Sequence, residues 1–256
     1  MKCFLEPSLK VHAVSYIDHQ GPGPIALVGS GEFLPQMVGI DEWLLADRIP
    51  RAAFLPTAAG QEGQESIQHW LRLGESHYAG MGIEPVPVPV LNRDDANNPE
   101  LAALIANVGL VYLSGGNPGY VAETLRGTLV WDAIVAAWQA GAALAGCSAG
   151  AMALTMEAPT RRGQDMVPTS GLALLDHLAV IPHFDQMASW NPGFLDRARQ
   201  PRPHGITVVG VDEDTAVVGG PSNWTVMGRL GATVFGPDGE AFHPAGSTFT
   251  LAPTPR

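Results

Sequence analysis

Residues 146–150, with the sequence Gly-Cys-Ser-Ala-Gly, join a short apolar strand to a helix and decide the fold. Residues 142–145 before them are small and apolar, and residues 149–156 after them are rich in Ala, Met and Leu. A Gly-x-Ser-x-Gly turn between a strand and a helix is typical of a nucleophile elbow, which lifts a serine hydroxyl above the sheet edge. Glycines flank the serine because the sharp turn brings backbone segments close together. Ser148 is therefore the candidate nucleophile, although a passive strand-to-helix turn would have the same motif.

Short apolar runs alternate with helical patterns along the amino-terminal part of the chain. Strands are predicted at 25–29, 52–56, 84–91, 109–113 and 142–145. Helices are predicted at 36–46, 62–78, 101–106 and 119–139, the last interrupted at Gly127. This alternation predicts an α/β fold, a three-layer sandwich with a mostly parallel central sheet and helices on both faces. The prolines within 84–91 favour an edge strand there.

The pattern changes after residue 158. Residues 159–170 are predicted to form a polar loop, and a strand is expected at 178–181. Further short strands are predicted at 206–211, 215–218, 224–227 and 232–235. Gly, Asp and Pro turns separate them, so we expect C-terminal antiparallel strands that extend or flank the sheet. Residues 1–24 end in Gly-Pro-Gly-Pro and are interpreted as an N-terminal arm or tail, which leaves 25–256 as a single domain.

Composition narrows the classes of partner and location. The chain has 256 residues, 46% of them hydrophobic, which is enough for one large domain with a sizeable core. A net charge of −11 argues against nucleic acid or an anionic membrane, each of which binds a basic face. The two cysteines, Cys3 and Cys147, fit a reducing compartment rather than a disulfide framework, and Cys147 is expected to point into the core. Without a membrane-spanning run or a secretory leader in the sequence, the expected location is the cytoplasm.

A serine nucleophile requires a base, an acid that orients the base, and N–H donors for the oxyanion. His183 follows the end of the strand predicted at 178–181 and is the candidate base. The N–H of Ala149 is one candidate donor, and Gly115 or Gly116 in the turn Ser-Gly-Gly-Asn at 114–117 would supply the second. Asn117 in this turn also fits a helix cap.

Several carboxylates compete for the place of the orienting acid. Asp165 lies in the loop between the serine and the histidine, where it can fold back over the site. Glu157, Asp176 and Asp185 are its competitors. No metal is expected, because the sequence has neither His-Glu-x-x-His nor a Cys/His cluster at ligand spacing.

These motifs, in this order, resemble those of the S51 serine peptidases, the aspartyl dipeptidase and cyanophycinase family. The resemblance extends from about residue 25 to at least 218 and rests on residues 27–31, 114–117, 146–151, 164–166 and 182–184. It implies the class I glutamine amidotransferase-like fold, no cofactor and a homodimer. By position it makes Ser148 the nucleophile, His183 the base, and Gly116 and Ala149 the oxyanion donors.

The resemblance leaves two branches open for the acid. Asp165 matches the acid of the dipeptidases, whereas residues 210–216 look more like the cyanophycinase branch, in which the acid is a glutamate. For residues 212–214 we favour a solvated turn between strands. Arg161 and Arg162, close to Asp165, are candidates to bind a substrate carboxylate, with exposed loop charges as the alternative. Gly115 and Asn117 complete the predicted substrate-binding residues.

The expected function is therefore a serine peptidase-type hydrolase with a Ser-His-Asp triad. Its substrate would be a small aspartyl peptide, either an Asp-X dipeptide or a β-aspartyl bond as in cyanophycin. An α/β-hydrolase is disfavoured because Asp165 follows the serine before any further strand, and an amidotransferase or cysteine-based sensor would require cysteine in place of Ser148. The remaining alternative is a non-peptidase member of the same fold, an amidotransferase-like binding or regulatory protein without hydrolysis.

Overall fold

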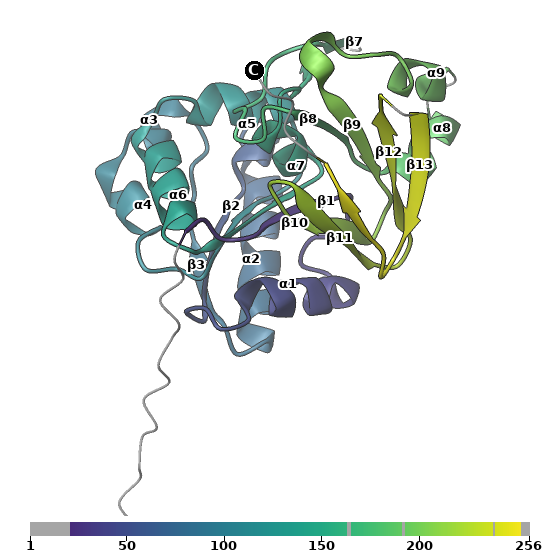
Figure 1. Ribbon diagram of the computed structural model, residues 1–256. Coiled ribbons are helices and arrows are strands. Elements are labelled where there is room, and N and C mark those ends of the chain that lie inside the picture. Colours follow the sequence, from purple (N-terminus) through teal and green to yellow (C-terminus); the bar gives the residue numbers. More distant parts are fainter. Residues whose placement is uncertain (1–20, 163–164, 191–192, 238, 252–256) are drawn as a thin grey trace, which may run out of the picture.

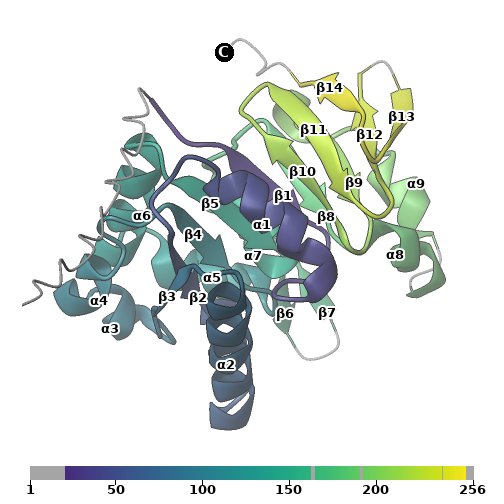
Figure 2. The same ribbon diagram turned by 90° about the horizontal axis from the view of Figure 1, so that it is seen from below.

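The computed structural model describes residues 21–162, 165–190, 193–237 and 239–251 (Figure 1). Its central sheet has eight strands in the order β14-β11-β10-β1-β5-β4-β2-β3 (Figure 2). Five of them run parallel: β1 (Ile25–Val28), β5 (Ala143–Cys147), β4 (Leu110–Leu113), β2 (Arg51–Leu55) and β3 (Glu84–Pro87). The C-terminal strands β10 (Thr215–Gly219), β11 (Asn223–Gly228) and β14 (Thr248–Thr250) continue the sheet in antiparallel orientation. The predicted α/β sheet is thus confirmed, with the proline-rich β3 at its edge.

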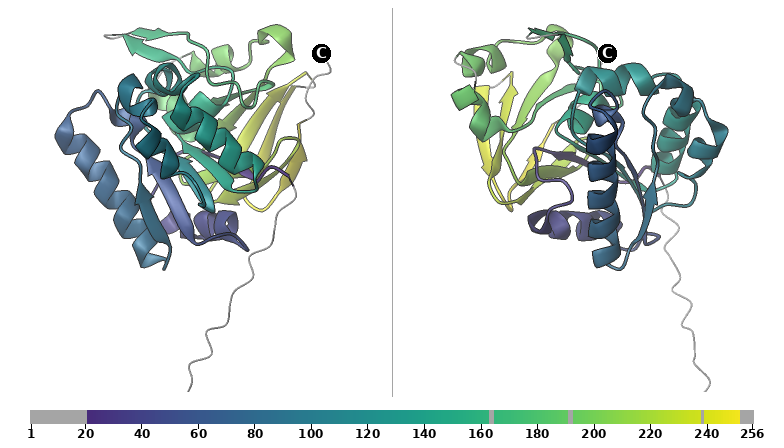
Figure 3. Two further views of the ribbon diagram at one scale, coloured as in Figure 1. Left: turned by 90° about the vertical axis from the view of Figure 1, so that its left-hand side faces the viewer. Right: turned by 180° about the vertical axis from the view of Figure 1, so that it is seen from behind.

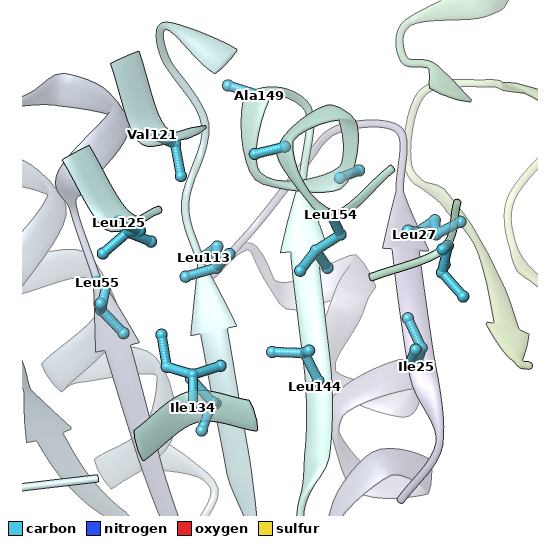
Figure 4. Close-up of a cluster of buried hydrophobic side chains, with 14 of the residues drawn as sticks. Ile25, Leu27, Leu55, Leu113, Val121, Leu125, Ile134, Leu144, Ala149 and Leu154 are labelled. Carbon is cyan, nitrogen blue, oxygen red and sulfur yellow. The ribbon is translucent and has the colours of Figure 1, made fainter. Parts of the chain in front are cut away.

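Helices cover both faces of the central sheet, because successive side chains of a strand point to opposite sides. On one face Leu27, Leu113 and Leu144 pack against α5 (Pro118–Leu125), α6 (Leu129–Gln139) and α7 (Ala149–Leu154) (Figure 4). The other face is covered by α1 (Val38–Leu45) and α2 (Gln64–Gly80) (Figure 2). Ala26 and Phe54 pack with residues of these two helices. The expected three-layer sandwich is therefore present.

Shorter helical segments connect these layers. The 3-10 turns are Pro35–Met37, Thr57–Ala59 and Pro203–Gly205. The helix predicted at 101–106 is α4 (Pro99–Ala103), and α3 (Arg93–Ala96) before it was not predicted. α3 begins with a capping box in which Asn92 and Asp95 accept each other's backbone N–H groups. The helix has only four residues, which is too few for hydrophobic periodicity to predict it.

A second sheet stands beside the central one (Figure 3). Its strands are in the order β13-β12-β9-β8. It comprises β8 (Leu178–Ile181), β9 (Thr207–Val211), β12 (Gly231–Gly236) and β13 (Gly239–Pro244), and β8 is parallel to β9. α8 (Phe184–Trp190) and α9 (Phe194–Ala198) follow β8 in the chain, and Phe184 and Ala198 pack against Phe235 of this sheet. The strand predicted at 178–181 is correct in its bounds, but it belongs to this second sheet.

The polar loop predicted at 159–170 is wrong. Its residues form a small hairpin of β6 (Thr160–Arg162) and β7 (Asp165–Val167), in which the backbones of Arg162 and Asp165 lie opposite each other. Two three-residue strands are too short for an alternating pattern to predict them. Most of the predicted arm, residues 1–20, lies outside the described residues. Within the described ranges, no helix is long and apolar enough to cross a membrane.

Candidate active site

The turn after β5 has the geometry of a nucleophile elbow. Ser148 has φ 48° and ψ −107°, a conformation that a non-glycine residue rarely adopts. A Cβ at Gly146 would lie 2.5 Å from the carbonyl carbon of Gly150, and one at Gly150 would lie 2.2 Å from the carbonyl oxygen of Leu113. Both glycines are therefore required for the close packing of strand and helix, and the predicted elbow is confirmed as a structural element.

His183 contacts the elbow from the second sheet. It follows β8, and its Nε2 lies 3.0 Å from the Oγ of Ser148. Its φ of 51° is also in the left-handed region. Its carbonyl accepts the N–H groups of Gln186 and Met187, so the first turn of α8 holds the histidine backbone. The sequence prediction that His183 faces Ser148 is thus supported by a direct contact between the two side chains.

Glu213 is the carboxylate that contacts the other nitrogen of this imidazole. Its Oε1 lies 3.1 Å from His183 Nδ1. The turn that carries it connects β9 to β10, and two hydrogen bonds support this turn: Glu213 N–H donates to Asp185 Oδ1, and Asp214 N–H donates to Ser30 Oγ. The interpretation of residues 212–214 as a solvated turn is wrong, because Asp212 is only 7% exposed and Glu213 is bonded to the histidine.

The other candidate acids have different surroundings. Asp165 lies in β7, and its side chain is outside the described part of the chain; the Nδ1 contact that it was predicted to make belongs to Glu213. Glu157 forms an ion pair with Arg202 at 3.0 Å. Asp176 lies 3.7 Å from His177, and Asp185 accepts the backbone of Glu213.

The proposed carboxylate-binding pair, Arg161 and Arg162, lies in β6, the strand paired with β7. The structure describes the backbone of these arginines, and Gln164 of the motif 164–166 lies outside the described residues. Their predicted contact with a substrate carboxylate therefore stays a prediction.

The loop after β4 places backbone N–H groups beside the elbow. Gly116 is exposed, with φ +138°, and a Cβ there would lie 2.6 Å from the carbonyl of Ala58. Ala149 begins α7, where the N–H groups of a helix have no partner within the helix. Among the described residues, neither the N–H of Gly116 nor that of Ala149 has a hydrogen-bond acceptor. Both groups are therefore available to a ligand at Ser148.

The remaining residues of this loop are already engaged. The N–H of Gly115 donates to Glu32 Oε1 at 2.8 Å, so this group is unavailable to a substrate. The Oδ1 of Asn117 accepts the N–H of Tyr120 at 3.2 Å, which confirms the helix-cap interpretation. The N–H of Asn117 donates to Ala58 O. Of the two N–H groups predicted to bind the oxyanion from this loop, those of Gly115 and Gly116, only that of Gly116 has no acceptor among the described residues.

Two side chains near the site were missed by the sequence reasoning. Trp190, at the end of α8, has its ring centroid 5.7 Å from that of His183 and is 59% exposed. Glu32 is buried below the loop after β4. Nothing in the local sequence distinguishes either residue. For Glu213 there was an indication, because residues 210–216 resemble the branch in which the acid is a glutamate.

Acidic residues precede and follow Glu213 in the chain. Burial, and after it the nearby charge of Asp185, raise the pKa of Asp212 to about 6. Asp214 is bonded to Arg229, whose Nε lies 3.0 Å from its Oδ2. Within the described ranges, no group of three or more His, Cys, Asp and Glu side chains is placed to hold a metal ion. The arrangement provides a hydroxyl, an imidazole, a carboxylate and two N–H donors, which are the groups that acyl transfer requires.

Comparison with known proteins agrees with this geometry. The chain is 25% identical over 174 residues to an uncharacterized peptidase, YgaJ, of Bacillus subtilis (strain 168), covering 66% of this chain and 72% of that protein. The crystal structure of a peptidase from an acI-B1 Actinobacterium is similar with a TM-score of 0.82 and 36% identity, covering 91% of this chain and 98% of the other.

A putative peptidase E protein from Listeria monocytogenes EGD-e shares the fold, with a TM-score of 0.55 and 14% identity over 87% of this chain and 98% of the other. The sequence model of peptidase family S51 matches residues 26–223, which is most of the chain. The chain therefore belongs to peptidase family S51.

Proposed function

We propose that this protein is a serine peptidase in which Ser148, His183 and Glu213 act as nucleophile, base and orienting acid. The observation that carries the proposal is the continuous series of contacts from Ser148 Oγ to His183 Nε2 at 3.0 Å and from His183 Nδ1 to Glu213 Oε1 at 3.1 Å. Membership of a peptidase family and the similarity to proteins named as peptidases support it. In such a triad the carboxylate holds the imidazole in the tautomer whose Nε2 accepts a proton.

The mechanism follows from these positions. Nε2 of His183 takes the proton of the Ser148 hydroxyl while Oγ attacks the peptide carbonyl. The N–H groups of Gly116 and Ala149 bind the oxyanion, and each such donor contributes about 10²–10³-fold to the rate. The imidazolium then protonates the leaving amine, and the same histidine activates the water that hydrolyses the acyl-enzyme.

Glu213 replaces Asp165 as the proposed acid. A neutral imidazole whose Nε2 accepts a proton carries one N–H at Nδ1, and this donor is directed at Glu213. Asp185 accepts the backbone N–H of Glu213, and this hydrogen bond fixes the backbone that positions the Glu213 carboxylate. The triad that we propose is accordingly Ser-His-Glu rather than Ser-His-Asp.

The substrate that we propose is a small aspartyl peptide, as the family resemblance implies. Both the Asp-X dipeptide and the β-aspartyl linkage remain candidates, and Arg161 and Arg162 are the candidate groups for its carboxylate. A glutamate at the acid position favours the β-aspartyl linkage, because it matches the cyanophycinase branch. A cytoplasmic location and a homodimer are further expectations.

Labelling with a fluorophosphonate, which reacts with activated serines, tests the proposal. We expect the wild type to be labelled and to hydrolyse at least one member of a panel of Asp-X dipeptides and β-Asp-Arg. Ser148→Ala should lose both properties. Ser222→Ala, which changes a serine in the turn before β11 remote from His183, is the matched control and should keep both. Turnover that survives in Ser148→Ala would exclude the mechanism. A wild type that is never labelled would favour a binding protein without hydrolysis.

A further inference from the structure

Glu32 is a buried carboxylate that the proposed mechanism does not use. It lies in the loop after β1 and is 8% exposed. Its Oε1 accepts the N–H of Gly115 at 2.8 Å, and its Oε2 accepts the thiol of Cys147 at 2.7 Å. Gly115 directly precedes the proposed donor Gly116, and Cys147 directly precedes the nucleophile. One side chain thus joins the two backbone segments that form the proposed oxyanion hole.

The loop that carries Glu32 has an unusual conformation. Gly31 has φ +84° and Phe33 has φ +63°, so the residues on both sides of Glu32 are in the left-handed region. For a bulky side chain such as Phe33 this conformation is strained. The ring of Phe33 is held by the rings of Tyr112 and Phe54, with centroids at 5.2 and 5.7 Å. The aromatic contacts therefore fix a strained turn whose effect is to direct Glu32 into the interior.

The contacts of Glu32 are suited to a carboxylate in the interior. A buried carboxylate is unfavourable unless hydrogen bonds compensate for lost water. Burial raises the pKa of the Cys147 thiol well above its usual value, and the charge of Glu32 adds to this, so the thiol stays protonated and donates. Each carboxylate oxygen therefore has a donor, one from the loop after β4 and one from β5.

The packing around Gly115 leaves little freedom for this loop. A Cβ at Gly115 would lie 2.7 Å from Oε1 of Glu32 and 3.5 Å from the Cβ of Ser148. The carboxylate of Glu32 and the side chain of Ser148 thus both lie close to Gly115. Removal of the carboxylate would release the N–H of Gly115 and the loop segment that continues into Gly116.

We propose that Glu32 is a positioning residue that holds the N–H of Gly116 at the correct distance from Ser148 and Ala149, and so sets kcat. This inference rests on the proposed function. An oxyanion donor acts on the transition state more than on the bound substrate, so its displacement lowers kcat and leaves KM nearly unchanged. Displacements of about 1 Å at such a site can cost about 100-fold in rate.

The test compares Glu32→Ala with Glu32→Gln on the best substrate found for the wild type. Glu32→Ala is expected to lower kcat about 10- to 100-fold with KM within about threefold. Glu32→Gln keeps an oxygen acceptor for the N–H of Gly115 and should retain kcat within about fivefold of the wild type. Glu42→Gln, at an exposed carboxylate on α1, is the matched control with near wild-type kcat. Melting curves show that all assays are made on folded protein.

The outcomes separate this inference from the proposed function. Wild-type kcat in Glu32→Ala, or a loss in Glu32→Gln as large as in Glu32→Ala, overturns the positioning role while the peptidase assignment stands. A wild type that neither hydrolyses nor is labelled overturns the proposed function itself. If Glu32→Ala does not fold, Glu32→Asp replaces it: the carboxylate is one carbon shorter and cannot reach both donors. The same loss of kcat supports the role, and wild-type kcat contradicts it.

Discussion

The central sheet and the second sheet contribute different halves of the site. The central sheet supplies Ser148 after β5 and Gly116 after β4, whereas the second sheet supplies His183 after β8 and Glu213 after β9. In both sheets the contributing strands are parallel neighbours, and the residues follow their carboxyl ends, where α/β proteins gather functional groups. The contact of 3.0 Å between Ser148 Oγ and His183 Nε2 joins the two halves.

The halves differ in what holds them. The nucleophile side is built by close backbone packing, since Gly146 and Gly150 leave no space for a Cβ. The base and acid side is built by side-chain hydrogen bonds, in which Asp185 accepts the N–H of Glu213 and Glu213 contacts Nδ1 of His183. Backbone strain is present in both halves. Of the seven described non-glycine residues with positive φ, four lie in the loops after β1, β5, β8 and β9, namely Phe33, Ser148, His183 and Asp214. Such strain is typical of functional loops.

The largest expected effect comes from breaking the contact between the halves. Ser148→Ala and His183→Ala should each lower kcat about 10⁴- to 10⁶-fold, because either change removes the activated nucleophile. The double variant should be no slower than either single variant, since the two residues act as a unit. Steady-state hydrolysis measures all three. Losses that multiply in the double variant would contradict the shared role.

A smaller effect is expected within the central-sheet half. Gly116→Ala places a methyl group 2.6 Å from the carbonyl of Ala58 and displaces the proposed donor, so kcat should fall about 10- to 100-fold. Gly127→Ala is the matched control, because Gly127 also has positive φ but has nothing within 4 Å of a Cβ. It should lose some stability and keep kcat. Equal kcat values in the two variants would argue against Gly116 as a donor.

On the second-sheet half, Trp190 offers an exposed ring beside His183. Because the histidine protonates the leaving amine, this ring is expected to contact the leaving-group side of the substrate. Trp190→Ala should raise KM about 3- to 10-fold through lost apolar contact and change kcat little. Trp43→Ala, at an exposed tryptophan on α1, is the control. If Trp190→Ala has the same KM as the wild type for substrates with leaving groups of different size, this contact is excluded.

The smallest effect concerns stability. The pKa of Asp212 is raised on folding to about 6, so the folded protein retains a proton that the unfolded chain releases at lower pH. This residue therefore lowers stability progressively as pH rises from about 4 to about 6, by on the order of 1–2 kcal/mol after solvent screening.

Asp212→Asn retains an acceptor for the N–H of Gly231 and removes the charge. Its melting temperature should exceed that of the wild type at pH 8, and the difference should shrink near pH 4. A difference that is independent of pH would contradict the raised pKa of Asp212.

The central-sheet half could be predicted from the sequence because its signals are local. Apolar runs mark the buried strands, and the glycine-containing turns at 114–117 and 146–150 directly follow two of them. The parallel strands, the three layers, the elbow and the edge position of β3 follow from these signals. The position of His183 at a strand end was predictable in the same way.

The acid could not be predicted in this way, because Glu213 is placed by long-range pairing. Its position depends on β9 lying next to β8 in a separate sheet, and an Asp-Glu-Asp turn has the composition of an ordinary exposed turn. The short hairpin of β6 and β7 and the capping-box helix α3 were missed because each has too few residues for hydrophobic periodicity. Glu32 was missed because its partners, Gly115 and Cys147, are distant in sequence.

The most direct test of the account is the kcat/KM of Glu213→Gln beside that of Asp165→Asn, the two carboxylates that compete for the place of the acid. We predict that Glu213→Gln lowers kcat/KM about 10²- to 10⁴-fold, because the amide can no longer stabilise the imidazolium. Asp165→Asn should stay within about tenfold of the wild type. The reverse result, an active Glu213→Gln and an inactive Asp165→Asn, would contradict the division of the site between the two sheets.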